Sequence, residues 1–138
     1  MKFIVYGQPT AKARPRFAKS GNFVTTYTDK KTSDYEALVR QSLFEQSGVV
    51  VMFNEQAQLE ATIWAYYRIP RATTKKKIEQ MINGQIRPLV KPDLDNIAKI
   101  ILDSLNKILF EDDKQIIKLT IEKWYSNDPL VEIEIKER

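Results

Sequence analysis

The chain of 138 residues contains no cysteine and no histidine. Without cysteine it has neither a disulfide framework nor a thiolate zinc site. Without histidine it lacks the commonest general base and the commonest transition-metal ligand. Any metal chemistry must therefore use oxygen ligands, which favours Mg²⁺ or Mn²⁺. No apolar run approaches the length of a membrane span, and the first residues, MKFIVYGQP, lack the apolar region of a signal peptide. We therefore expect a cytoplasmic protein with no membrane partner.

The chain does have an apolar fraction of 43% with charges interspersed, as in a soluble globular protein. Its length predicts a single domain over residues 1–138, without repeats or a linker. The net charge of +4 is uneven: residues 1–40 hold eight bases and three acids, residues 68–91 seven and one, and residues 92–138 seven and eleven. This distribution predicts a polyanion bound near a carboxylate cluster, and ordinary solubility charge is the alternative.

Apolar periodicity and turn residues predict the secondary structure. Strands are expected over residues 2–7, 58–68, 116–125 and 130–136, and the apolar run 49–53 is a further short strand or sheet edge. Helices are expected from Thr32 or Ser33 to about Gln46, from a cap at Thr73 or Thr74 to Gly84, and from Leu94 to Leu109. The short connection 126–129 predicts an antiparallel hairpin of the last two strands. The order predicts an α+β, two-layer fold, with helices on one face of a mixed or largely antiparallel sheet.

Two segments carry the basic residues that we expect to contact DNA phosphates. Residues 10–28 form a loop or ragged hairpin that turns at 20–22, and an exposed loop without a ligand is the alternative. Three consecutive lysines lie on the first turn of the helix after Thr74, where they oppose the helix dipole unless they meet an anion. A solvated, mobile lid is the alternative there. The predicted contacts are Lys12, Arg14, Arg16, Lys19, Lys75, Lys76, Lys77, Arg87 and Lys91.

Acidic residues flank the helix that begins at Leu94. Asp93 and Asp95 lie two residues apart at its start, and Asp112 and Asp113 follow its end, so the chain must fold back for the two pairs to meet. Three or more carboxylates without histidine form a hard-oxygen site that suits Mg²⁺, which can activate water and orient a phosphate. Helix capping by an aspartate at 93 or 95 and a pairing of Asp95 with Lys99 are the simpler alternatives. Asp103 lies between Lys99 and Lys107 and is explained by surface ion pairs.

The run KPDLDN…K…LD.LN….F.DD.Q, which begins at Lys91, resembles the RusA family of crossover-junction endodeoxyribonucleases, Holliday junction resolvases often found in prophages. The N-terminal half also resembles members of that family. It has Gly7, Pro9 and Lys12, RPRF at 14–17, and then YT at 27–28, KT at 31–32 and YE at 35–36. Ala13 departs from the pattern, because a glycine often precedes RPRF, and Glu111 adds an acid that allows the DD pair to be aligned one residue away.

The resemblance implies a Mg²⁺-dependent homodimer that resolves four-way DNA junctions by paired symmetric nicks, in DNA recombination and repair. By motif, it implies that Asp93, Asp95 and Asp113 are catalytic metal ligands, with Asp112 as the alternative third ligand, and that Lys99 is the catalytic lysine. Mn²⁺ is the alternative cofactor. Two rival functions remain: a prophage protein that binds DNA junctions without cutting them, and a metal-dependent nuclease that cuts other branched DNA.

Overall fold

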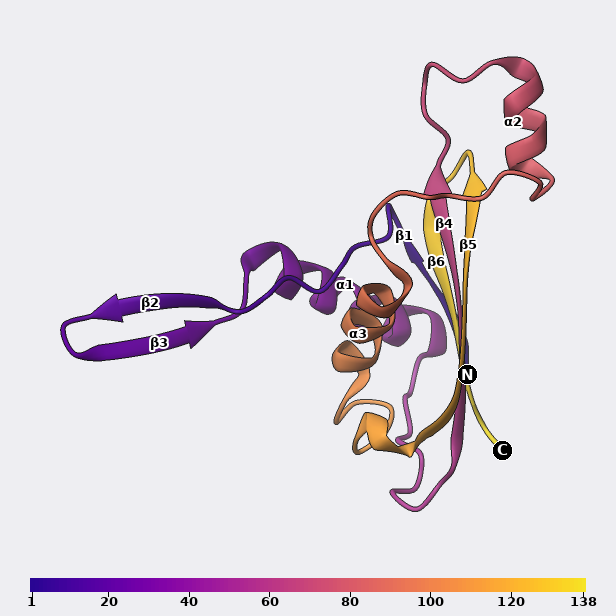
Figure 1. Cartoon of the computed structure of the whole chain (residues 1–138). Coiled ribbons are helices and arrows are strands. Elements are labelled where there is room, and N and C mark those ends of the chain that lie inside the picture. Colours follow the sequence, from indigo (N-terminus) through magenta and orange to yellow (C-terminus); the bar gives the residue numbers. More distant parts are fainter.

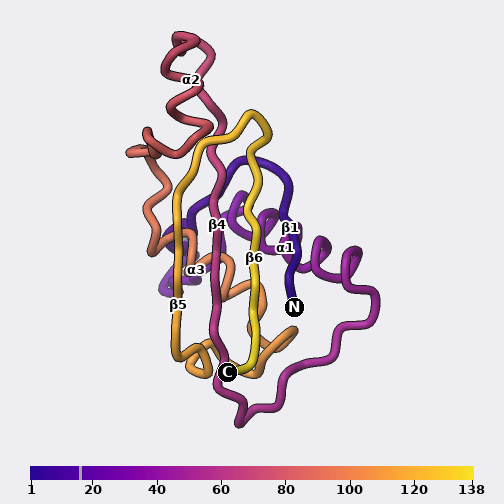
Figure 2. Tube along the Cα trace, turned by 90° about the vertical axis from the view of Figure 1, so that its right-hand side faces the viewer, coloured from indigo at the N-terminus to yellow at the C-terminus, as the bar shows by residue number. Residues whose placement is uncertain are grey.

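Four strands form one mixed sheet in the computed structural model of the chain (Figures 1 and 2). They are β1 (Lys2–Tyr6), β4 (Leu59–Arg68), β5 (Ile116–Ser126) and β6 (Leu130–Glu137), in the spatial order β1-β6-β4-β5. Strand β6 is antiparallel to both β1 and β4, whereas β4 and β5 are parallel. The structure describes residues 1–15 and 17–138 in full, and describes Arg16 only as part of a strand.

The helices α1 (Lys30–Ser47) and α3 (Leu94–Leu105) lie on the same face of this sheet (Figure 1). A shorter helix, α2 (Lys75–Ile82), lies beyond one end of the sheet, and a hairpin of β2 (Arg16–Ser20) and β3 (Phe23–Tyr27) projects away from the body (Figure 1). A single 3₁₀ turn, η1 (Asp113–Gln115), precedes β5. The α+β architecture, with helices covering one face of a mixed sheet, is confirmed. In the described part of the chain, no helix is long and apolar enough to cross a membrane.

The core lies between the sheet and the two long helices. Strand β4 alternates as the sequence predicts, and Leu59, Ile63 and Tyr67 on its inner face are almost completely buried. Helix α3 buries Ile97, Ile101 and Leu105 at the spacing that predicts an amphipathic helix, and it also buries Ile100, which lies outside that stripe. Since α3 contacts α1 as well as the sheet, more than one stripe of the helix is covered. This packing determines where the N-terminal end of α3 lies.

The predicted hairpin of the last two strands is wrong. Strands β5 and β6 follow each other closely along the chain, but β4 lies between them and pairs with both (Figure 2). The outer edge then falls to β5, whose Ile117 and Leu119 are 48% and 43% exposed. Strand β4 is central and its alternating residues are buried more completely than those of β5, because a central strand loses more solvent contact than an edge strand.

The predicted end of one helix and one predicted short strand are also wrong. Helix α3 ends at Leu105 rather than Leu109, and the buried side chains of Leu109 and Phe110 belong to a turn in which the Lys107 N–H donates to the carbonyl of Phe110 at 2.8 Å. The apolar pattern therefore extends past the end of the helix, because the turn that follows is also buried in the core. The run 49–53 forms no strand, and Val49 is 85% exposed.

The three predicted helix starts can be compared with the structure, and the start of α3 at Leu94 is confirmed. Helix α1 begins at Lys30, earlier than expected, because the Asp29 side chain accepts a hydrogen bond from the Lys31 N–H at 3.2 Å. Thr32, one of the expected caps, is buried and accepts a bond from the Ala13 N–H at 3.1 Å. Thr74 caps α2 as predicted. The tight turn expected at 20–22 is confirmed by the β2–β3 pairing.

Candidate active site

The carboxylate of Asp93 lies at the start of α3 without a capping role. Asp93 occupies the N-cap position, and its backbone carbonyl accepts from the Ile97 N–H at 3.1 Å, but its side chain makes no capping hydrogen bond. Helix capping therefore does not explain this residue. Asp95 lies in the first turn, and the side chains of Asp93 and Asp95 are both exposed. Two carboxylates at one helix entrance are thus available to a ligand.

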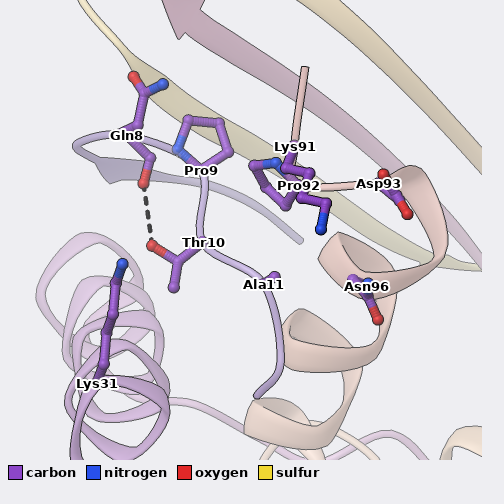
Figure 3. Close-up of a pocket in the computed structure, with 9 residues that line it drawn as sticks. All are labelled: Gln8, Pro9, Thr10, Ala11, Lys31, Lys91, Pro92, Asp93 and Asn96. Carbon is purple, nitrogen blue, oxygen red and sulfur yellow. Dashed lines mark hydrogen bonds between the residues drawn. The ribbon is translucent and has the colours of Figure 1, made fainter. Parts of the chain in front are cut away.

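Asp93 borders a cavity of about 480 Å³ between the N-terminal loop, α1 and the start of α3 (Figure 3). Two lysines from different elements also line this cavity: Lys31 from α1 and Lys91 from the segment before α3. The cavity thus combines two cations with one carboxylate, an arrangement that suits a phosphate beside an acidic site. Its lining residues are Gln8, Pro9, Thr10, Ala11, Lys31, Lys91, Pro92, Asp93 and Asn96.

A second cavity, of about 390 Å³, lies farther along the exposed side of α3. It is lined by Lys99, Asp103 and Asn96 from the helix, and by residues 12–15 of the N-terminal loop. Asn96 borders both cavities, so one loop and one helix face connect them. Lys99 is 63% exposed along its side chain, with its ammonium 3.7 Å from the Asp103 carboxylate. The predicted ion pair of Asp103 with Lys99 is present, whereas Lys107 pairs with Glu111.

The two aspartates of the DD pair have different environments. Asp112 caps η1: its carboxylate accepts from the Lys114 N–H at 2.8 Å, and this hydrogen bond lowers the pKa of Asp112. Burial raises the pKa of Asp113, and the neighbouring Asp112 and Asp103 raise it further, against the opposing effect of Lys99. Asp113 therefore lies within electrostatic range of Lys99 and Asp103 on α3. Unlike Asp112, Asp113 does not cap η1, so its carboxylate can bind a ligand without breaking a cap.

Gln115 holds this acidic turn in place. Its side chain is 7% exposed, and its Oε1 accepts from the N–H groups of Glu111 at 3.0 Å and Asp112 at 3.3 Å. Its Nε2 donates to the carbonyls of Asn54 at 2.9 Å and Ala57 at 3.2 Å. The sequence pattern F.DD.Q contains Gln115, but nothing in it assigned a role to the residue. The structure makes it the connection between the turn and the start of β4.

The donor chemistry of these aspartates fits a hard divalent cation only in part. Among the residues that the structure describes, no three carboxylates lie close enough together to hold a metal ion. The predicted set of Asp93, Asp95, Asp112 and Asp113 is therefore not assembled. Mg²⁺ commonly binds through one or two carboxylates and completes its shell with water and substrate phosphate. The pair at the start of α3, free of capping bonds at Asp93, fits that mode of binding.

Two of the bases predicted to contact DNA are engaged within the fold. The Lys12 ammonium lies 3.2 Å from Glu36 and 3.3 Å from Asp103, and its side chain is only 20% exposed. The Arg87 guanidinium stacks on Trp124 at 3.5 Å from the ring centroid. Arg87 also pairs with Glu122 at 3.6 Å and donates its Nε–H to the carbonyl of Lys123. Clustering in the sequence could not separate such ion-paired bases from free ones.

The other predicted DNA contacts lie on the surface. The side chains of Arg14, Lys19, Lys91 and the three lysines of α2 are exposed. Arg16 lies outside the fully described residues, so its predicted contact is not placed. Lys31 was not among the predicted contacts, although the structure directs it to the cavity beside Asp93 (Figure 3). Lys31 belongs to the KT pair at 31–32 that carries part of the family resemblance, and this motif is the signal that could have identified it.

Comparison with known proteins agrees with the sequence patterns. Residues 6–136 match the family described as Endodeoxyribonuclease RusA. The protein named "Uncharacterized protein YqaN" from Bacillus subtilis (strain 168) is 31% identical over 139 residues, which cover 99% of this chain and 96% of that protein. The family match covers nearly the whole chain, including both motifs and the segment between them. The chain therefore belongs to the RusA family of endodeoxyribonucleases.

Proposed function

We propose that this chain is a homodimeric resolvase that cuts four-way DNA junctions by paired, symmetric nicks and uses Mg²⁺, with Mn²⁺ as the alternative. Family membership supports an endodeoxyribonuclease. The observation that carries the proposal is the carboxylate of Asp93, which makes no capping bond and borders a cavity with Lys31 and Lys91. An exposed carboxylate beside two lysines weakens the binding of a phosphate, so DNA binding alone does not account for Asp93, whereas a metal-dependent reaction does.

Asp93 and Asp95 are the residues that would hold the divalent cation, with water and substrate phosphate completing its shell. Asp113 would join them as a third carboxylate only if the η1 turn moved closer to the start of α3, because the structure does not bring the three together. Such an ion activates water and stabilises the leaving oxygen of a phosphodiester. Lys31 and Lys91 attract the DNA phosphate to the cavity and orient it there. Lys99 lies one and a half turns after Asp93, exposed and close to Asp103, and it neutralises the charge that develops on the phosphate.

Asp113 is preferred to Asp112 as the third carboxylate because of their local structures. The carboxylate of Asp112 is used in the cap of η1. Asp113 has a raised pKa that follows from burial and from neighbouring acids. A carboxyl group with this shift stabilises the fold less when it is ionised, and such a cost is common at functional sites. A positive ligand near Asp113 would offset that cost.

The substrate's symmetry supports a dimer. A four-way junction has two-fold symmetry, so two identical sites related by a dyad can cut two strands at equivalent positions. Lys19 of the β2–β3 hairpin and the exposed lysines of α2 would bind phosphates around each site, since these elements extend from the body in different directions (Figure 1). Junction binding should therefore weaken steeply with salt concentration.

The test is cleavage of a synthetic four-way junction in Mg²⁺, with a matched linear duplex and EDTA as controls. Wild-type protein should introduce paired nicks only in the junction. Asp93→Asn should lower the cleavage rate by at least about 100-fold, the order of loss expected when a group that stabilises transition-state charge is removed. Junction binding should persist or tighten, because a negative charge near phosphate is gone. Asp128→Asn, at an exposed aspartate in the turn before β6, is the matched control.

Three results would contradict the proposal. Cleavage by Asp93→Asn at the wild-type rate would show that the site is assigned wrongly. Tight junction binding without cleavage in Mg²⁺ or Mn²⁺ would favour a non-catalytic binding protein. Equal cutting of flaps, forks and four-way junctions would favour a nuclease for branched DNA in general.

A further inference from the structure

The backbone immediately before α3 is held by side chains from two neighbouring strands. The Tyr67 hydroxyl on β4 donates to the carbonyl of Pro92 at 2.6 Å. The Lys123 ammonium on β5 donates to the carbonyl of Val90 at 2.6 Å. The same ammonium lies 5.1 Å from the centroid of the Tyr67 ring, so the two side chains form one contact group. Both bonds end on the segment 90–92, which leads directly into Asp93.

Burying Tyr67 at this position would cost free energy if its hydroxyl had no hydrogen-bond partner. The residue is 1% exposed, and burial raises its pKa, with a further contribution from the nearby charge of Asp93. The phenol is therefore a neutral donor that lies close to Asp93. A buried hydroxyl needs a hydrogen-bond partner, and phenylalanine would fill the same core volume without that need. The hydroxyl is directed to the residue adjacent to Asp93 rather than to the core.

Lys123 holds the same segment in a second way. Its backbone carbonyl accepts the Nε–H of Arg87, while its side chain binds the carbonyl of Val90. The segment between α2 and α3 is thus attached to β5 through both the main chain and the side chain of one residue. Asp93 itself makes no side-chain capping bond. Its direction therefore depends on how the backbone before it is held.

We propose that Tyr67 and Lys123 are positioning residues for Asp93: by binding the carbonyls of Pro92 and Val90, they direct the Asp93 carboxylate toward the cavity that it shares with Lys31 and Lys91. The inference rests on the proposed function and deepens it. Neither residue touches the substrate. Each fixes the backbone from which a metal-binding carboxylate projects, as the residues that support metal ligands commonly do.

The first test compares Tyr67→Phe with Tyr66→Phe. Tyr66 is the adjacent tyrosine of β4 and lies on the opposite face of the sheet, where burial raises its pKa and the charges of Glu132 and Glu122 raise it further. Tyr67→Phe should raise the Mg²⁺ concentration for half-maximal cleavage by about fivefold, the factor expected from one lost hydrogen bond. The KM for the junction should stay within about twofold, since no DNA contact is removed. Tyr66→Phe should match wild type in both quantities.

The second test uses Lys123→Met, with Lys118→Met as its control on the same strand. Lys118 is exposed and lies 4.0 Å from Glu60, far from the segment 90–92 in the strand register. Lys123→Met should also raise the Mg²⁺ requirement. The double variant Tyr67→Phe/Lys123→Met should raise it by less than the product of the single effects, because both side chains hold one segment. Lys118→Met should leave the requirement unchanged.

A readout without catalysis separates this inference from the proposed function. Mg²⁺ and Mn²⁺ should raise the melting temperature of wild-type protein, and Asp93→Asn should abolish that rise. Tyr67→Phe should reduce it, even if the protein cuts no junction. An unchanged Mg²⁺ requirement together with an unchanged metal-induced rise would overturn the inference. A loss of activity in Tyr67→Phe that is explained entirely by its lower melting temperature would also overturn the inference. A wild-type protein whose melting temperature no divalent ion raises would do so too.

Discussion

Replacing Gln115 with leucine should destabilise the protein far more than an ordinary glutamine substitution. The change keeps a side chain of similar size but removes all four hydrogen bonds that Gln115 makes. The carbonyl of Asn54 also accepts from the Ala57 N–H at 2.9 Å, so it keeps a partner. The N–H groups of Glu111 and Asp112 and the carbonyl of Ala57 lose the partner that Gln115 provides.

The bond to the Ala57 carbonyl is buried, and those to the two N–H groups are part-buried. Loss of each partner costs about 1 kcal/mol, so the three groups predict a loss of about 3 kcal/mol, reduced to about 2 kcal/mol by the apolar gain of leucine. The entropy of unfolding for a chain of this length, about 2 cal/mol/K per residue, converts each kcal/mol into about 3.5 °C. We therefore expect a melting temperature about 7 °C below wild type. Gln41→Leu, at an exposed glutamine of α1 bonded to Glu45, should change it by less than about 2 °C.

The assay is thermal unfolding followed by circular dichroism, combined with junction cleavage at least about 20 °C below the lower melting temperature, where Gln115→Leu is still folded. Cleavage by the folded variant should fall, because Asp113 follows the turn that Gln115 holds, while junction binding should persist. A melting temperature within about 2 °C of wild type would refute the reasoning, since it would mean that water satisfies these groups as well as the glutamine does.

Three further changes test other contacts. Asp113→Asn should stabilise the protein relative to wild type increasingly as the pH rises from below the ordinary carboxyl pKa to above the raised pKa of Asp113. The raised pKa contributes stability at low pH that is lost as the pH rises through it, and the variant has no such loss. Cleavage should nevertheless fall, whereas Asp112→Asn should retain it; chemical unfolding across pH and junction cleavage measure both. Gly84→Ala should cost about 2 kcal/mol by thermal unfolding, because φ is +86° and an added Cβ would lie 2.6 Å from Trp124. Lys12→Met should also cost about 2 kcal/mol, since it leaves the part-buried carboxylate of Glu36 without its cation and leaves Asp103 with only the exposed Lys99. An unchanged melting temperature with weakened junction binding would show a DNA contact instead.

Local patterns predicted the elements that carry the site better than they predicted their arrangement. Ile97, Ile101 and Leu105 recur at the helical period because one face of the helix is buried. This local spacing is enough to predict the helix. The pairing of β4 with β5 could not be inferred in this way. Strand order depends on which strand buries most surface once all of them are present, and the short connection between β5 and β6 suggested adjacency instead.

In the candidate site too, the sequence predicted which residues take part better than it predicted how they are arranged. The acids at 93, 95, 112 and 113 were visible in the sequence, but whether a carboxylate caps a helix depends on a backbone geometry that composition does not reveal. The structure assigns that capping role to Asp112 and withholds it from Asp93. Lys12 and Arg87 stand in basic segments as DNA-binding residues do, yet their ion pairs reach across elements distant in sequence. Such partners become visible only after the chain has folded.

The place of β6 between β1 and β4 has a consequence for how the protein is made. When a ribosome has synthesised the first 126 residues, β1, β4 and β5 exist, but the strand that joins β1 to the others does not. The facing edges of β1 and β4 then have no strand between them to pair with, and contacts between distant parts of the sequence form slowly. Folding of the sheet, and with it a fixed position for α3, must therefore wait until residues 130–137 leave the exit tunnel. A nascent chain of this kind would stay inactive toward DNA until β6 had left the ribosome.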